Sequence, residues 1–135
     1  MQFSEFFKKY QEVRNCILDE NYLSSLLAIY PGILVAKADG VFGAEEKENL
    51  VSALKVASKE DLVVMCEMYS ELCYLANADQ SMQDAAMACI KEEIAGKDDL
   101  KQIILDIMQS TADADGSLSQ EEQDKINEIK STLSI

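Results

Sequence analysis

Apolar residues recur every three or four positions along almost the whole chain, which is the spacing that one face of an α-helix requires. The pattern predicts about seven helices, which begin near Phe3, Leu23, Ala44, Ser58, Ser81, Asp98 and Ser119. We expect no strand, because no segment shows the alternation of apolar and polar residues that a half-buried strand shows. The predicted fold class is therefore all-α.

The links between these segments are short, and the chain contains one proline and five glycines. Pro31-Gly32 falls inside the second apolar segment. We expect it to kink or break that helix, because proline lacks the amide donor and clashes with the preceding turn. No linker separates two halves, so residues 1–135 are expected to form a single helical domain.

Acidic residues outnumber basic ones, with 25 Asp and Glu against 12 Lys and Arg and a formal net charge of −13. Such a charge repels phosphate backbones and anionic lipid surfaces, so we expect no nucleic-acid partner; it favours cations or basic partners. No apolar run approaches the ~20 residues of a membrane span, and the N-terminus lacks the pattern of a signal peptide. We therefore expect a cytoplasmic protein without a transmembrane segment.

The four cysteines are expected to be reduced and structural. None forms a Cys-x-x-Cys pair and the chain has no histidine, so the common zinc-binding spacings cannot be assembled. Cys66 and Cys73 lie on one helix face with Leu62, Met65 and Tyr69. We expect that face to belong to the core.

One nine-residue segment occurs twice, 76 positions apart, from 38 to 114. We call residues 38–46 (Ala-Asp-Gly-Val-Phe-Gly-Ala-Glu-Glu) the N-terminal hinge and residues 114–122 (Ala-Asp-Gly-Ser-Leu-Ser-Gln-Glu-Glu) the C-terminal hinge. A degenerate third copy at residues 78–84 keeps Asp79 but has Gln80 in place of glycine. The chain is thus expected to be one compact bundle with two pseudo-repeated helix–Asp-Gly–helix hinges.

Most of this repeat is explained by one helix ending and the next beginning. The glycine should adopt a left-handed conformation that ends a helix, and the apolar residue two positions later should pack in the core. The next residue would cap the second helix, and the second glutamate would accept the N–H of the cap. In the two copies these residues are Gly40, Phe42, Gly43 and Glu46, and Gly116, Leu118, Ser119 and Glu122. Only the aspartates, Asp39 and Asp115, are left without a clear role.

A cation site is the alternative interpretation of the hinges. The aspartate and the second glutamate of each copy come from opposite ends of one tight loop, and oxygen-only ligands suit Ca²⁺ or Mg²⁺. The candidate ligands are Asp39, Glu46, Asp113, Asp115 and Glu122, with Glu45 and Glu121 as secondary candidates.

The C-terminal hinge comes closer to a calcium loop of the EF-hand type. With Gly116 as the sixth loop residue, Asp113 is third, and Asp115 and Glu122 are fifth and twelfth. Thr111 at the first position is a poor substitute for aspartate. In the N-terminal hinge the same register places Val35 first and Lys37 third, neither of which suits a cation, so the C-terminal hinge is the preferred candidate and a pair of true EF-hands is not expected.

At these residues the chain resembles the TerB-like family, the all-helical domain of bacterial tellurite-resistance clusters. The shared pattern is a helix ending in Ala-Lys-Ala-Asp-Gly or Ala-Asp-Ala-Asp-Gly, a short turn, and a Glu-Glu pair that opens the next helix, here within residues 36–46 and 112–122. The resemblance covers roughly residues 20–133 and departs from the family at Gly43, where Ser or Asp is more usual.

The resemblance implies a helical fold with pseudo-symmetric halves, a proposed acidic metal-binding site, and a role in stress or metal-response systems, often beside membrane partners. The positions that match the family pattern are Asp39, Glu45, Glu46, Asp115, Glu121 and Glu122. Membership alone does not establish tellurite resistance, because function belongs to sites and not to folds.

Two classes of function therefore stay open. The first is a non-enzymatic TerB-like module whose acidic hinges bind a divalent cation in a stress or metal/tellurite response. The alternative is a helical protein-interaction scaffold without a metal site, in which the hinges are purely structural. We expect no enzyme, because no nucleophile stands beside a base.

Protein partners are expected, and a homo-oligomer would also fit the sequence. The surface that such a partner could cover is the acidic surface or the apolar stripe formed by Phe3, Phe6, Phe7 and Tyr10. Because stripes at helical spacing usually face a core, we favour packing of this stripe on the bundle itself.

Overall fold

A computed structural model describes residues 2–40, 42–114, 116 and 118–135. Within that part of the chain the structure contains seven helices and no strand, which confirms the all-α prediction. The helices are α1 (Phe3–Arg14), α2 (Glu20–Ala36), α3 (Ala44–Ala57), α4 (Leu62–Ala76), α5 (Gln80–Ile94), α6 (Asp98–Asp113) and α7 (Gln120–Leu133).

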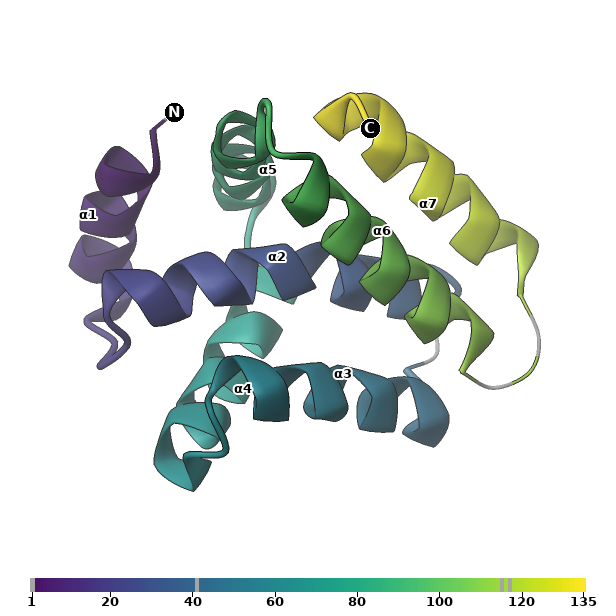
Figure 1. Ribbon diagram of the computed structural model, residues 1–135, viewed down its shortest axis with the longest axis horizontal. Coiled ribbons are helices and arrows are strands. Elements are labelled where there is room, and N and C mark those ends of the chain that lie inside the picture. Colours follow the sequence, from purple (N-terminus) through teal and green to yellow (C-terminus); the bar gives the residue numbers. More distant parts are fainter. Residues whose placement is uncertain (1, 41, 115, 117) are drawn as a thin grey trace.

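Helix α2 is the central element of the bundle. It runs across the middle of the molecule and touches each of the other six helices, with its most extensive packing against α6 (Figure 1). Residues 29–33 are all buried, so this part of α2 is covered around its whole circumference. A helix that is apolar on every side is stable only when neighbours surround it.

Of the kink or break predicted at Pro31-Gly32, the break is wrong, since α2 continues through both residues to Ala36. Gly32 lets two neighbours approach closely: a Cβ there would lie 2.9 Å from Ile107 Cγ2 and 3.2 Å from Leu50 Cδ2. Packing of α3 and α6 against this point therefore outweighs the donor that Pro31 removes from the helix.

Helix α1 is fastened to α4 by a buried polar cluster. The carboxylate of Glu71, 2% exposed, accepts from Arg14 Nε at 2.8 Å and Arg14 Nη2 at 3.0 Å, and from the hydroxyl of Tyr10. The Arg14 guanidinium also lies over the ring of Tyr74, 4.2 Å from its centroid. The aromatic stripe packs on the bundle as we favoured, with Phe6 and Tyr10 fully buried.

Two helices begin at a different cap from the one that we predicted. Asp61, and not Ser58, caps α4 by accepting from Val63 and Val64 N–H. Asp79, and not Ser81, caps α5 by accepting from Met82 N–H at 2.8 Å. The degenerate third copy of the repeat is thus an ordinary helix start, because its aspartate serves as the cap itself.

The cysteines occupy different environments, and the predicted core face on α4 is wrong in part. Cys66 is exposed, Cys73 is half-buried, and Leu62 beside them is 70% exposed. Cys89 is buried, and burial raises the pKa of its thiol to about 12, which keeps it protonated and unreactive. All four are free thiols in the structure.

Candidate functional site

The two hinges repeat in backbone geometry as well as in sequence. Gly40 and Gly116 have φ values of +81° and +82°, in the left-handed region that favours glycine. The Gly40 N–H donates to the Lys37 carbonyl at 3.0 Å, and the Gly116 N–H donates to the Asp113 carbonyl at 3.0 Å. The predicted glycine stop is therefore confirmed at both hinges.

Each hinge then starts a helix with its second glutamate folded back onto the cap. Glu46 Oε1 accepts from the Gly43 N–H at 3.0 Å, and Glu122 Oε1 accepts from the Ser119 N–H at 3.1 Å. Ser119 completes its box because its hydroxyl accepts from the Glu122 N–H at 3.1 Å, whereas Gly43 has no side chain to do so. The predicted capping role of both glutamates is confirmed.

The apolar residues of the two hinges differ. Phe42 is half-buried and packs against the core as predicted, but Leu118 is 41% exposed, so its predicted place in the core is wrong.

The central feature of the site is that the hinges bring Glu46 and Glu122 together. The two side chains lie close enough for the Glu122 carboxyl to raise the pKa of Glu46. Glu46 is 2% exposed and Glu122 is 1% exposed. Two carboxyl groups, 76 positions apart in the sequence, thus meet in a place that water hardly reaches.

In each of these carboxyl groups, one oxygen accepts a hydrogen bond from the helix cap and the other has no donor. The Oε1 atoms hold the helix caps, while Glu46 Oε2 and Glu122 Oε2 are buried without a hydrogen-bond partner among the described residues. An unsatisfied buried oxygen of this kind is costly, because it has lost water and gained nothing in exchange. A shared proton or a bound cation would satisfy both atoms.

The environment of Glu46 favours the protonated form of its carboxyl group. Burial raises the pKa of Glu46 to about 7, against the lowering effect of the Gly43 N–H. The neighbouring Glu122 carboxyl and the charge of Asp39 raise it further. The protonated form of Glu46 is therefore favoured at pH values at which an exposed glutamate is ionised.

The remaining predicted ligands are less centrally placed. Asp39 is exposed but close enough to act on Glu46, and Glu45 and Glu121 are exposed on the first turns of α3 and α7. Asp113 is exposed at the end of α6 and accepts from Gln109 Nε2 at 3.1 Å. The prediction for Asp115 lies outside the described residues.

The EF-hand register finds little support in the geometry of α6. Thr111, its first position, is fully buried in the helix, and its hydroxyl accepts from Asn49 Nδ2 at 2.9 Å. Asn49 also donates to the hydroxyl of Ser110 at 3.1 Å, so it joins α3 to α6. In the part of the chain that the structure describes, no group of three or more His, Cys, Asp or Glu side chains is arranged to hold a metal ion.

The geometry thus defines an all-helical protein with two repeated Asp-Gly hinges that place a pair of buried carboxyl groups between them. The model of the family described as "Tellurite resistance protein TerB" matches residues 25–135. The chain therefore belongs to the TerB family, as the resemblance of its hinges had indicated. No curated protein and no solved structure gave a significant match.

Sequence reasoning identified Glu46 and Glu122 individually but assigned them to two separate loops. The signal that could have joined them is the repeat itself, since the resemblance implies pseudo-symmetric halves in which equivalent residues could meet. Among the described helices, none is long and apolar enough to cross a membrane.

Proposed function

We propose that this chain is a non-enzymatic TerB-family module in which both hinges contribute to one divalent-cation site, centred on Glu46 and Glu122. The cation would take the place of the proton that the pair holds. The observation that carries this proposal is the pair of buried Oε2 atoms without donors, one from each hinge.

The chemistry of the donors supports a hard cation. Carboxylate oxygens with no His or Cys beside them suit Ca²⁺ or Mg²⁺ better than softer metals. The net charge of −13 concentrates cations around the protein. Asp39, which already acts on Glu46, and Asp115, its equivalent in the repeat, are the residues that we infer to complete the site, with water in the remaining positions.

The family points to a setting for this activity. The matching family is named for tellurite resistance, and we propose a stress or metal-response role for this chain, in the cytoplasm and with protein partners. The cation would be the signal or the structural support in that role, and no reaction at the site is required.

Calorimetric titration of the protein with Ca²⁺, Mg²⁺ and Mn²⁺ at pH 8 and pH 6 tests the proposal. We expect one cation per chain, tighter binding at pH 8, and release of protons on binding, measured by comparing buffers of different ionisation enthalpy. Glu46→Gln and Glu122→Gln should each abolish binding. Glu45→Gln and Glu121→Gln carry the same change of charge one residue away and should retain it.

Absence of heat for all three cations at both pH values would overturn the cation site. So would equal losses of affinity in the four variants, because these would reflect net charge alone. The same experiment tests the alternative, an interaction scaffold with purely structural hinges, which is favoured by the hydrogen bonds that already occupy both Oε1 atoms. In that case the pair binds only a proton.

A further inference from the structure

A second site lies away from the hinges, in a cavity of about 450 Å³ between α2, α3, α5 and α6. This volume is within the range of small-molecule sites in proteins, which is about 300–1,000 Å³. The lining residues are Ser24, Ser25, Leu27, Ala28, Ile29, Ala53, Val56, Ala57, Ile90, Glu93, Ile94, Leu100, Ile103, Ile104 and Ile107.

The lining is almost entirely aliphatic. Its floor is made of buried side chains, among them Leu27, Ile29 and Ile94, and its rim includes Val56 and Ile103, which are 79% and 46% exposed. No aromatic ring and no basic group is among the lining residues. A flexible hydrocarbon chain fits such walls better than a flat ring system, which is usually bound by stacking on aromatic side chains.

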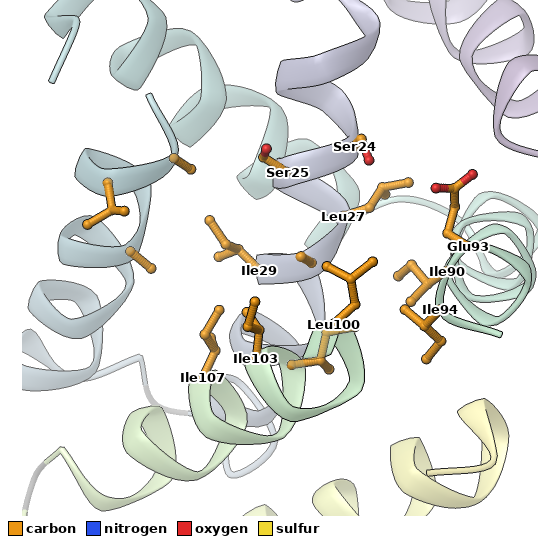
Figure 2. Close-up of a pocket in the computed structure, with 15 residues that line it drawn as sticks. Ser24, Ser25, Leu27, Ile29, Ile90, Glu93, Ile94, Leu100, Ile103 and Ile107 are labelled. Atoms are coloured by element: carbon orange, nitrogen blue, oxygen red, sulfur yellow. The ribbon is translucent and has the colours of Figure 1, made fainter. Parts of the chain in front are cut away.

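The polar groups of the cavity are spread along one edge of it. Figure 2 shows Ser24, Ser25 and Glu93 on one side of the view, with Ile103, Ile107 and Ile94 toward the other. The hydroxyl of Ser25 already donates to the Asn21 carbonyl at 3.1 Å, so it faces a ligand as an acceptor. Glu93 is the one charged residue in the lining.

We propose that this cavity binds a single-chain aliphatic amphiphile with a cationic head, the chain lying on the isoleucines and the head at Glu93. An ammonium group donates to a carboxylate and to hydroxyl acceptors, and hydrogen bonds between charged groups are the strong ones. An anionic amphiphile would meet Glu93 and the net charge of −13, both of which repel it. The proposal does not depend on the hinge site.

The test uses decylammonium, decanol and decanoate, each kept below its micelle concentration and titrated into the full chain by calorimetry. We expect decylammonium to bind most tightly and decanoate most weakly. Glu93→Gln should weaken decylammonium binding about tenfold, the effect of losing one charged hydrogen bond, and leave decanol affinity unchanged. Glu92→Gln, on the same helix but outside the lining, is the control of equal charge.

A variant that fills the cavity tests its location. Ala57→Phe adds a ring between α3 and the floor and should abolish binding of all three amphiphiles. Thermal unfolding shows whether Ala57→Phe is folded. If it is not, Ala53→Phe is the cavity-filling variant to use instead. In NMR spectra, the backbone amides whose chemical shifts change on addition of decylammonium should lie in the four lining helices.

Three outcomes would overturn the proposal. These are a preference for decanoate, equal decylammonium affinity in the wild type and the filled variant, or binding of a basic amphipathic helical peptide where none of the amphiphiles binds.

Discussion

In two glutamates of this protein, the two carboxyl oxygens have different surroundings. In Glu46 and Glu122, Oε1 holds a helix cap and Oε2 is buried without a donor. The capping role was predictable from the sequence, because the spacing between cap and acid is local. The second role was not, because it depends on a residue 76 positions away.

A change of Glu46 to Gln should alter how stability depends on pH. In the wild type, burial raises the pKa of Glu46 from 4.5 to about 7, so the folded state binds the proton more tightly than the unfolded state does. The contribution of this proton to the free energy of unfolding, up to about 3 kcal/mol, is fully present below pH 4.5. It is lost as the pH rises through 7. Glu46→Gln lacks this loss, and its amide can donate to Glu122.

Urea unfolding of wild type and Glu46→Gln at pH 5, 6, 7 and 8, without added metal, measures the effect. We expect the free energy of unfolding of the variant to rise relative to that of the wild type mainly between pH 5 and pH 7, and to level off by pH 8. Glu45→Gln, exposed and one residue away, should show no such trend. Parallel pH curves for wild type and Glu46→Gln would contradict the shared proton.

Substitution of Gly40 or Gly116 by Ala should destabilise the protein through the backbone alone. An added Cβ meets nothing within 4 Å at either position, but both φ values are positive. The expected loss in the free energy of unfolding is about 1–2 kcal/mol per site, the cost of the left-handed conformation for an L-residue. Chemical denaturation measures it, and similar losses at both sites would reflect the equivalence of the hinges. An unchanged midpoint would show that the hinges tolerate another conformation.

At the scale of the helices, the periodicity of the sequence predicted the number of elements and both hinges. Periodicity failed where tertiary contacts determine the structure. Pro31 lies within a continuous helix because neighbouring helices pack around it. Leu118 is exposed, which no local pattern indicates. The cap of α5 was missed because Asp79 was interpreted as part of a degenerate hinge. In each case the competing signal lies outside the segment itself.

The fastening of α1 is another element-scale contact that no local pattern predicts. Arg14 and Glu71 are 57 positions apart, and the family match begins at residue 25, after α1. Arg14→Ala would leave the buried Glu71 carboxylate with only the Tyr10 hydroxyl, and we expect a loss of about 2 kcal/mol or more, since breaking a buried pair strands a charge.

Denaturation combined with amide hydrogen exchange measures this loss and shows where it falls. We expect the amides of α1 to lose protection before those of α2 do. Lys125→Ala removes an exposed pair with Glu128, whose side chain is 66% exposed, and should change stability by less than about 1 kcal/mol. Equal losses of stability in the two variants would show that the Arg14–Glu71 contact contributes no more than an exposed ion pair does.

For the whole molecule, the path of two helices places the two candidate sites at opposite ends of α3 and α6. Helix α3 carries Glu46 in its first turn and reaches the cavity near Ala57, whereas α6 passes the cavity at Ile103 and ends at the C-terminal hinge. The residues of the hinge site could be found in the sequence, but their arrangement could not, because a repeat in the sequence gives no orientation of one copy relative to the other. The cavity was not predicted, because its lining comes from four helices that the sequence alone does not place together.

One composite site makes a prediction that two separate loops do not. If one cation bridges the hinges, then titration with Ca²⁺ or Mg²⁺ at pH 8 should protect the amides of Gly43 and Ser119 from exchange with the same midpoint. At a hundred times the dissociation constant, binding to the folded state alone adds about 2.7 kcal/mol to stability. Glu46→Gln, although it changes only the N-terminal hinge, should remove the protection at Ser119 as well.

Two independent loops would instead give two midpoints, and Glu46→Gln would leave the exchange of the Ser119 amide as it is in the wild type. Because the variant keeps an oxygen that can accept from the Gly43 N–H, loss of the cap cannot account for an effect across the bundle. Amide exchange followed residue by residue during the titration therefore distinguishes a site built by the whole fold from sites that belong to each hinge.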